Sequence, residues 1–388
     1  MINRILTSKL KQLISKTNKS IMLLGPRQVG KSTLLREFEY DLIVDLADEG
    51  IYRDHLKDPS LLRAQVLGLV SKHKKILIDE IQRLPTLLNS VQSLIDSQKF
   101  VFMLTGSSAR KLKKGGANLL PGRLFWYHLF PLSYWELKDQ WDLTKSLTIG
   151  TLPEIYLQDY GQDLLSDYIN SYLRQEIQAE AIVRNIDSYA RFLDAAAENS
   201  GKIINYGKLA SDSEIPKETL RRFYDILADT LLVQRLRGFT DIKGSRKALQ
   251  REKFIFFDMG VRNAILKQHK NVFTKAQLGE LFEQWFILQV ISYASYERNE
   301  WEFYYYRDDL MKEVDLVIDC GDRLIAVEIK YSNRFREEFI YGLSAFRKYT
   351  KKATQCYLVY CGDTLQKRDE IAVMPYQDFL DRIAIGLI

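Results

Sequence analysis

The segment that decides the fold follows a short apolar run, Ile21-Met22-Leu23-Leu24, and reads Gly25-Pro26-Arg27-Gln28-Val29-Gly30-Lys31-Ser32-Thr33. It fits the pattern G-x-x-x-x-G-K-[ST] between an expected strand and an expected helix, which is the context a phosphate-binding loop requires. Glycines let the backbone curl so that its N–H groups face phosphate oxygens, and the lysine reaches the β- and γ-phosphates. The sequence therefore predicts that residues 25–33 bind a nucleotide. The alternative is a glycine-rich turn without a ligand.

Two further apolar runs end in residues suited to ATP hydrolysis. Residues 75–78 lead into Asp79 and Glu80. An aspartate at a strand end can hold Mg²⁺ together with the Ser32 hydroxyl, and Glu80 can polarise the attacking water. Residues 100–104 lead to Ser107, which can position the water or contact the γ-phosphate. The alternative is a pair of solvated strand ends.

Downstream of these strands, Arg123 is placed where it could reach the nucleotide of a neighbouring subunit. An arginine supplied in trans is a recurrent device for neutralising transition-state charge. The alternative is a surface residue or an ion pair within the chain.

Length and composition limit the class of protein. The chain has 388 residues, of which 46% are hydrophobic and 27% charged, so disordered and fibrous proteins are excluded and two or three domains are expected. No apolar run approaches the roughly 18 residues of a membrane span, and the amino terminus lacks the pattern of a signal peptide. Three cysteines argue against a disulfide framework or a structural zinc site. We expect a reduced, cytoplasmic protein that does not enter a membrane.

Strands alternate with helical spacing in the first part of the chain, which predicts an α/β fold with a parallel sheet. The pattern becomes helical from Tyr134 to about residue 185. Three short helical patterns follow, at 189–199, 205–212 and 217–230. From 276 the order is helix, three strands, helix and strand. We therefore expect four units, with the boundaries 1–130, 131–188, 189–270 and 271–388.

The excess positive charge is concentrated in one segment. Residues 201–270 hold 15 Lys or Arg against 8 Asp or Glu, so this segment carries +7 and the remainder about −1. Residues 201–240 fit a winged helix whose third helix begins at Lys217, and such a helix can present cations to a DNA groove. The residues expected to contact DNA are Lys217, Arg221, Arg222, Arg246, Lys247 and Arg251. The alternatives are a solvated charged loop and a winged helix that binds protein.

The last third contains a hairpin whose register can be deduced. Gly321-Asp322 reads as a two-residue turn, so paired residues sum to 643. This register pairs apolar residues on one face, and on the other it sets Glu313 against Lys330 and Asp315 against Glu328. Directly opposed carboxylates destabilise a hairpin, and a divalent cation would relieve the repulsion. Neutralising Asp315 should accordingly stabilise the metal-free protein.

The chain as a whole resembles the prokaryotic AAA-type ATPases that carry a carboxyl-terminal domain of unknown function. The resemblance rests on residues 25–33, 76–80, 105–112, 118–123, 130–133 and 150–154. It implies a P-loop AAA+ module with a helical lid, a central winged helix and a carboxyl-terminal domain similar to restriction endonucleases. In that domain Asp315 and Glu328 would hold a metal ion, Lys330 would orient water, and Glu283 would be the upstream acid. The alternative is a charged sheet face without chemistry.

The expected function is that of an ATP-binding and ATP-hydrolysing AAA+ protein that uses Mg²⁺, acts on DNA and forms homo-oligomers. Metal-dependent DNA cleavage is the further expectation from the restriction-type motif. One alternative is a nucleotide-dependent switch that binds DNA or protein and has a catalytically silent carboxyl-terminal domain. Another is an ATPase that remodels a protein partner.

Overall fold

The structure is a computed structural model, and it describes residues 2–69, 74–97, 100–108, 110, 112, 120, 122–169, 186–240 and 252–388. Its amino-terminal part contains a five-stranded parallel sheet in the order β2-β3-β4-β1-β5. The strands are β1 (Ser20–Leu24), β2 (Leu42–Asp45), β3 (Lys74–Asp79), β4 (Phe100–Gly106) and β5 (Leu124–His128). The α/β class is confirmed, as are the strands expected at residues 21–24, 75–78 and 100–104.

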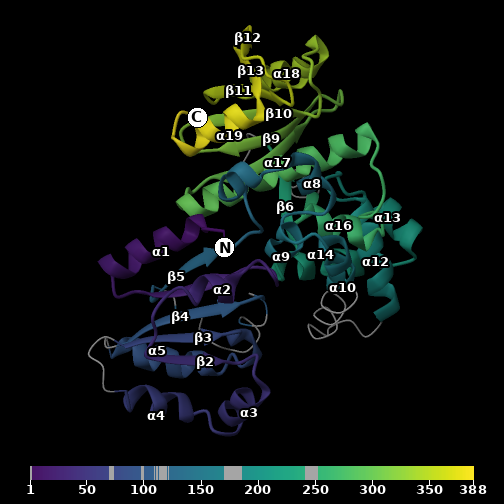
Figure 1. Ribbon diagram of the computed structural model, residues 1–388. Helices are drawn as coiled ribbons and strands as arrows, with labels where there is room; N and C mark the ends of the chain where they lie inside the picture. Colours follow the sequence, from purple (N-terminus) through teal and green to yellow (C-terminus); the bar gives the residue numbers. More distant parts are fainter. Residues whose placement is uncertain are drawn as a thin grey trace.

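Both faces of this sheet are covered, which is why all five residues of β1 are buried. The helices are α1 (Ile5–Lys16), α2 (Lys31–Leu35), α3 (Glu49–Lys57), α4 (Leu61–Leu67) and α5 (Leu87–Asp96), and the short 3₁₀ turn η1 (Ile81–Arg83) follows β3. Helices α4 and α5 pack on one face through Leu62, Leu88 and Val91. Helix α1 packs on the other through Leu6 and Leu10, in a core shared with the middle of the chain (Figure 1).

The middle of the chain is mainly helical. It comprises α7 (Tyr134–Leu137), the 3₁₀ turn η2 (Lys138–Gln140), α8 (Leu143–Thr148), α9 (Pro153–Leu157), α10 (Gly161–Asp167), α12 (Ile186–Glu198), α13 (Tyr206–Ser213), α14 (Lys217–Asp229), β6 (Val233–Gly238), β7 (Glu252–Phe256) and α16 (Met259–Ile265). On α14, Leu220, Phe223 and Leu227 are buried, whereas Lys217 and Arg221 are exposed. Strands β6 and β7 form an antiparallel pair.

This antiparallel pair belongs to the carboxyl-terminal sheet. The sheet has eight strands in the order β12-β13-β11-β10-β9-β8-β6-β7, and β6 pairs with β8 (Glu302–Arg307) in parallel at Arg237 and Gly238. A boundary between 270 and 271 therefore passes through a continuous sheet. The sequence could not indicate this, because a strand pattern does not reveal a distant partner strand.

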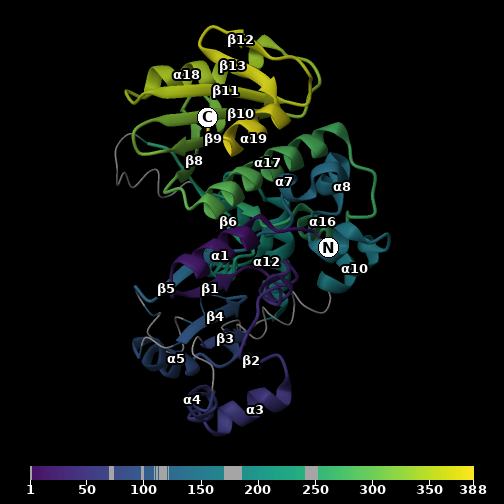
Figure 2. The same ribbon diagram turned by 60° about the vertical axis from the view of Figure 1, so that its left-hand side comes forward.

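The remaining elements follow the predicted order of helix, three strands, helix and strand. They are α17 (Lys275–Glu297), β8, β9 (Glu313–Asp319), β10 (Leu324–Lys330), η4 (Glu337–Ile340), α18 (Tyr341–Tyr349) and β11 (Thr354–Tyr360), followed by β12 (Gln366–Arg368), β13 (Ile371–Pro375) and α19 (Tyr376–Ala384). Helices α17 and α19 share a core on one face of the sheet, and α18 packs on the other. Figure 2 shows α17 running between this sheet and the rest of the molecule. None of the helices in the described ranges has the length and apolarity needed to cross a membrane.

Candidate functional site

The loop after β1 has the geometry that its sequence predicts. The Gly25 N–H donates to the Gly106 carbonyl at 3.2 Å, which ties the loop to the end of β4. A Cβ atom on Gly25 would lie 2.4 Å from the Leu129 carbonyl oxygen, so only glycine fits there. Gly30 has φ +93°, a left-handed conformation that favours glycine. The loop thus leads from the carboxyl end of a buried parallel strand into α2, which is where such sheets bind ligands.

Lys31 lies inside this loop. Its side-chain Nζ donates to the carbonyl oxygens of Gly25 and Pro26, both at 2.9 Å, and the residue is buried. The ammonium therefore sits where the loop curls, and phosphate oxygens would compete with these carbonyls for it. Of the other predicted loop residues, Val29 is buried, Thr33 is exposed, and Arg27, Gln28 and Ser32 are half-buried.

The two acids at the end of β3 are held by one hydroxyl of β4. Thr105 Oγ1 donates to the Asp79 carboxylate and accepts a hydrogen bond from the Glu80 N–H at 2.9 Å. Asp79 is buried, and Glu80 has a left-handed backbone with φ 58°. Because β4 lies between β3 and β1, its last residues contact the acids on one side and the phosphate loop on the other.

Gln82 is a site residue that sequence reasoning missed. Its Nε2 donates to the Glu80 carboxylate and to Ser107 Oγ, the latter at 3.0 Å, and its side chain is buried. It therefore joins two predicted residues that come from different strands. The available signal was a polar residue two positions after the acid pair, in the turn that leaves the strand.

Arg123 is placed differently from the expectation of a catalytic arginine. It forms a two-point ion pair with Asp96, in which Nε lies 2.6 Å from Oδ1 and Nη2 lies 3.1 Å from Oδ2. It precedes β5, whose first residue pairs with Ser20 at the amino end of β1. The phosphate loop leaves the opposite end, roughly 15 Å away at 3.3 Å per residue. Within one subunit Arg123 therefore cannot reach the predicted phosphate site, and the ion pair within the chain is the reading that the structure favours.

A cavity of about 190 Å³ lies beside the phosphate loop. It is lined by residues of the amino terminus, of α2 and of α9: Ile2, Arg4, Gly30, Thr33, Leu34, Glu37, Leu132, Pro153, Glu154, Leu157 and Gln158. Its wall is partly apolar and partly polar, which suits a flat, weakly polar group. Asp258 fixes the turn that leads to Pro153, because its carboxylate accepts from the Thr151 N–H at 2.7 Å.

The basic middle segment is only partly surface charge. Lys217, Arg221 and Arg222 are exposed on α14, and Arg246, Lys247 and Arg251 lie outside the described residues. Arg235 forms ion pairs with Asp225 and, at 3.6 Å, with Glu252. The charge of Arg235 is therefore already paired within the chain.

Lys253, in the same basic segment, is also paired within the chain. It is 3% exposed, and its Nζ lies 2.7 Å from Glu313 and 3.3 Å from Glu283. Burial alone would lower the pKa of Lys253, but the nearby carboxylates of Glu283 and Glu313 raise it, so the residue carries its charge. Strand β7 thereby delivers a cation from the middle segment into the carboxyl-terminal sheet.

The predicted register of the β9–β10 hairpin is confirmed from Leu316–Val327 to Asp319–Leu324. The ladder stops before Asp315 and Glu328, which are both buried. Asp315 Oδ2 instead accepts from the Ile329 N–H at 2.8 Å. The Lys330 Nζ lies 2.5 Å from Glu328 and 3.4 Å from Asp315. The expected repulsion between the two carboxylates is therefore offset by an ammonium group, and Lys330 does not pair with Glu313.

These charges form one group, which we term the acid–lysine cluster: Lys253, Glu283, Glu313, Asp315, Glu328 and Lys330. Burial, together with the Asp315 carboxylate, raises the pKa of Glu283 to about 7. The same causes raise the pKa of Glu328, whose Oε2 is buried and makes no hydrogen bond. Among the residues that the structure describes, no three acidic, histidine or cysteine side chains are arranged to hold a metal ion. The predicted trio of Glu283, Asp315 and Glu328 is brought together, but around lysines.

Comparisons with known proteins divide the chain into three parts. Residues 17–138 match a family model described as an AAA domain. Residues 140–271 and 278–379 match the models of two different domains of unknown function. Similar proteins include an uncharacterized protein of Mycobacterium tuberculosis, 24% identical over 80% of this chain and 70% of its own length. Another, from Methanocaldococcus jannaschii, is 25% identical over 82% of this chain and 77% of its own length.

Solved structures with some likeness include the ORC1 protein of Aeropyrum pernix in complex with DNA and the protein VC1899 of Vibrio cholerae. The first is 12% identical, covers 69% of this chain and 93% of its own and has a TM-score of 0.27. The second is 13% identical, covers 95% and 97% and has a TM-score of 0.23. Residues 17–138 are therefore similar to an AAA domain, and the parallel sheet with the loop after β1 has the arrangement of a nucleotide-binding P-loop domain.

Proposed function

We propose that the amino-terminal domain binds ATP with Mg²⁺ and hydrolyses it. The observation that carries this proposal is the end of β4, which is tied to the phosphate loop through Gly106 and to both acids through Thr105. The two halves of a hydrolytic site are thereby fixed side by side. The cavity of about 190 Å³ beside the loop offers space for the nucleotide base.

Each polar residue then has a role that its chemistry allows. The ammonium of Lys31 and the N–H groups of the loop bind the β- and γ-phosphates. The Ser32 hydroxyl and the Asp79 carboxylate are hard oxygen donors of the kind that Mg²⁺ prefers, and they would hold the ion, which neutralises phosphate charge when bound. Glu80 accepts a proton from the attacking water, and Gln82 keeps the Glu80 carboxylate oriented toward Ser107.

Substitution of Glu80 tests this function. The wild-type protein should release phosphate from ATP in the presence of Mg²⁺, and Glu80→Gln should bind ATP with unchanged affinity while turnover falls by at least about 100-fold. Glu39→Gln, which changes an exposed acid that does not line the cavity, serves as the control. Full turnover by Glu80→Gln would remove Glu80 from the proposed chemistry, and a wild-type protein without turnover would refute hydrolysis.

We further propose that the protein acts on DNA and that copies of the chain assemble. The exposed cations of α14 support DNA contact. The other expected DNA contacts, Arg246, Lys247 and Arg251, are proposed on the sequence alone. Changing Lys217, Arg221 and Arg222 to Gln should reduce the salt dependence of DNA binding by about one unit of slope for each lost phosphate contact. A matched triple change of Arg53, Lys57 and Arg63 on α3 and α4 should leave it unaltered. Equal slopes in both variants would move the DNA site elsewhere.

In an assembly, Arg123 could serve a neighbouring active site only after leaving Asp96. We therefore propose this role on the sequence alone, with mixed oligomers as the test. Arg123→Ala and Glu80→Gln subunits should each hydrolyse poorly, and their mixture should regain part of the activity. In the mixture an intact arginine can face an intact acid. Failure to regain activity at any mixing ratio would end the proposal of a role in trans.

The carboxyl-terminal region supports two competing functions. The unpartnered Glu328 Oε2 and its oxygen-rich surroundings suit a divalent cation, which would favour phosphodiester hydrolysis with Lys330 beside the water. The lysines that already neutralise the acids favour the alternative. In it, this region is catalytically silent, and the nucleotide bound to the amino-terminal domain switches the binding of DNA or protein.

Adding Mg²⁺ or Mn²⁺ to the Lys31→Ala variant distinguishes these two functions. The substitution disables the Mg²⁺ site of the nucleotide-binding domain, so any effect of the metal arises elsewhere. A rise in melting temperature that Asp315→Asn removes, with nicking of DNA, would support the first function. Absence of both would support the switch. Asp315→Asn should itself destabilise the protein, contrary to the expectation from opposed charges, because Asp315 accepts from Ile329 and pairs with Lys330.

A further inference from the structure

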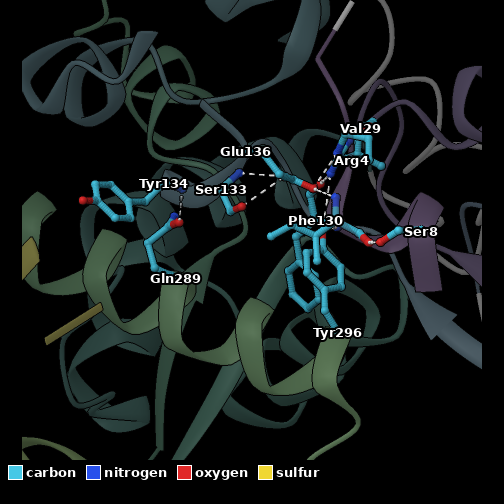
Figure 3. A network of polar contacts seen from close by, with 10 residues as sticks. Arg4, Ser8, Val29, Phe130, Ser133, Tyr134, Glu136, Gln289 and Tyr296 are labelled. Atoms are coloured by element: carbon cyan, nitrogen blue, oxygen red, sulfur yellow. Dashed lines mark hydrogen bonds and ion pairs between the residues drawn. The ribbon is translucent and has the colours of Figure 1, made fainter. Parts of the chain in front are cut away.

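Arg4 connects parts of the molecule that are far apart in the sequence. Its guanidinium donates to the carbonyls of Val29 and Phe130, each at 2.6 Å, to Glu136 Oε1 at 2.9 Å and to the Tyr296 hydroxyl oxygen at 3.4 Å. Figure 3 shows these groups converging on the one side chain. They belong to the phosphate loop, the segment after β5, helix α7 and helix α17.

The guanidinium and its partner acid are both buried. Arg4 is 6% exposed, and the Glu136 side chain is fully covered. Glu136 is itself held in place, because it caps the first turn of α7 at Ser133 and accepts from the Ile5 N–H at 3.0 Å. A buried charge needs several well-aligned partners, and the planar fork of arginine can reach groups in several directions where a lysine cannot. The contact to the phosphate loop therefore depends on Arg4 being an arginine.

The contact with Val29 fixes the part of the loop that faces phosphate. A peptide unit is planar, so its C=O and the next N–H point in opposite directions. Because the Val29 carbonyl accepts from Arg4, the Gly30 N–H points away from Arg4. Backbone N–H groups of this kind are what bind phosphate in such loops. Arg4 thus orients one of the phosphate donors without touching the nucleotide's phosphates.

The contact with Tyr296 reaches the carboxyl-terminal part of the molecule. Tyr296 lies in the last turn of α17, and its hydroxyl oxygen also accepts from the Phe130 N–H at 3.1 Å. About two turns earlier, Gln289 on the same helix accepts from the Tyr134 N–H at 2.9 Å. Glu283 of the acid–lysine cluster lies on this helix as well, roughly 20 Å from Tyr296 at 1.5 Å per residue. The carboxyl-terminal end of α17 is therefore anchored beside the phosphate loop. Nearer its amino-terminal end, the helix carries Glu283 of the acid–lysine cluster.

We propose that Arg4 is a positioning residue for nucleotide binding and that, with Tyr296, it couples the phosphate loop to helix α17. Phosphate bound at the Gly30 N–H polarises the same peptide unit whose carbonyl Arg4 holds, so nucleotide binding changes the strength of the contact to Val29. The remaining contacts of Arg4 pass this change to Tyr296. By linkage, the anchoring of α17 alters nucleotide affinity by the same factor. The inference rests on the proposed nucleotide binding and adds a route from that site to the carboxyl-terminal sheet.

Hydrogen exchange of the full chain, measured with and without Mg·ADP, tests this coupling. In the wild-type protein, Mg·ADP should change amide exchange in residues 290–297 by about threefold or more, a shift of modest coupling size. Tyr296→Phe removes only the hydroxyl that Arg4 and Phe130 share. It should abolish the response of α17 while changing the dissociation constant of Mg·ADP by no more than about fivefold. Tyr293→Phe, one turn earlier on the same helix, is the matched control and should respond like the wild type.

Arg4→Lys keeps the positive charge but removes the planar guanidinium, whose N–H groups reach several partners at once. It should weaken Mg·ADP binding by about 10-fold or more and abolish the α17 response, because the charge-assisted bond to Val29 is lost. The inference is overturned if wild-type α17 does not respond although Mg·ADP binds, or if Tyr296→Phe responds like the wild type. A wild-type protein that does not bind Mg·ADP at all would overturn nucleotide binding first and the coupling with it. These outcomes distinguish a failure of the route from a failure of the site.

Discussion

Compared with the phosphate loop, the acid–lysine cluster is assembled from residues much farther apart in the chain. The loop uses residues 25–33, with two short strand ends beside it. The cluster draws on β7, α17, β9 and β10, and its residues span 253–330. In the loop, one lysine is held by backbone carbonyls, so that the site as a whole is ready to accept an anion. In the cluster, buried and half-buried carboxylates and lysines neutralise one another.

The difference teaches what each kind of site depends on. In a site built mainly from backbone groups, the loss of one side chain weakens ligand binding but leaves the fold stable. A site built from buried, mutually paired charges behaves in the opposite way, because removing one partner leaves the others uncompensated. The predictions that follow separate these two cases.

The largest effect is expected for Lys31→Ala. It removes the point charge on the β- and γ-phosphates and should weaken Mg·ATP binding by at least about 100-fold, measured by calorimetric titration. The free energy of unfolding should change little beyond the loss of two hydrogen bonds. Lys16→Ala, at the exposed end of α1, is the control. Retained affinity in Lys31→Ala would contradict the assignment of the loop.

Lys253→Met should show the reverse behaviour. Glu283 and Glu313 would lose their buried cation. The free energy of unfolding, measured in urea, should therefore fall by about 3–5 kcal/mol. Mg·ATP affinity should stay within about twofold of the wild type. A variant as stable as the wild type would mean that the cluster does not depend on compensation by lysine.

Gln82→Leu should affect turnover alone. The change removes the hydrogen bonds to Glu80 and Ser107 at nearly constant volume, so kcat should fall by about 10-fold while Mg·ATP affinity is retained. Gln92→Leu on α5 provides a substitution of the same kind away from the acids. Unchanged kcat in Gln82→Leu would show that Glu80 needs no such support.

The last prediction concerns pH and the buried Asp258. Burial raises the pKa of Asp258 from 3.8 to about 6, although the N–H groups of Thr151, Val261 and Gly260 oppose the shift. The folded state therefore binds more protons than the unfolded state between these values, and the free energy of unfolding should fall as pH rises from about 4 to about 6. At about 1.4 kcal/mol per unit, this loss is roughly 2–3 kcal/mol.

Urea unfolding at pH 4.5 and pH 7 measures this loss. Asp258→Asn should lack this part of the pH dependence, whereas the contribution of Glu283, which titrates in the same direction, is common to both proteins and cancels. An identical pH dependence of the two proteins would rule out Asp258 as its source.

Local signals predicted much of this molecule. The glycine-lysine loop, the strand ending in Asp79 and Glu80 and the register of the β9–β10 hairpin follow from short stretches in which neighbours in sequence are neighbours in space. Gln82, the contacts of Arg4 and the position of Lys253 did not follow, because each depends on partners more than twenty residues away. Arg123 illustrates the same limit, since its pairing with Asp96 depends on where β5 meets α5.

The continuous sheet bears on how this chain can be divided. Strands β6 and β7 add to the edge of β8, so a fragment that begins near residue 271 would expose the backbone N–H and C=O groups of β8 to other molecules. Such an open edge pairs readily with a second copy and leads to aggregation. A fragment ending near 270 would in turn lose the partners of Lys253 and leave its charge on an unsupported ribbon. The middle and last thirds of the protein should therefore be expressed and purified as a single fragment.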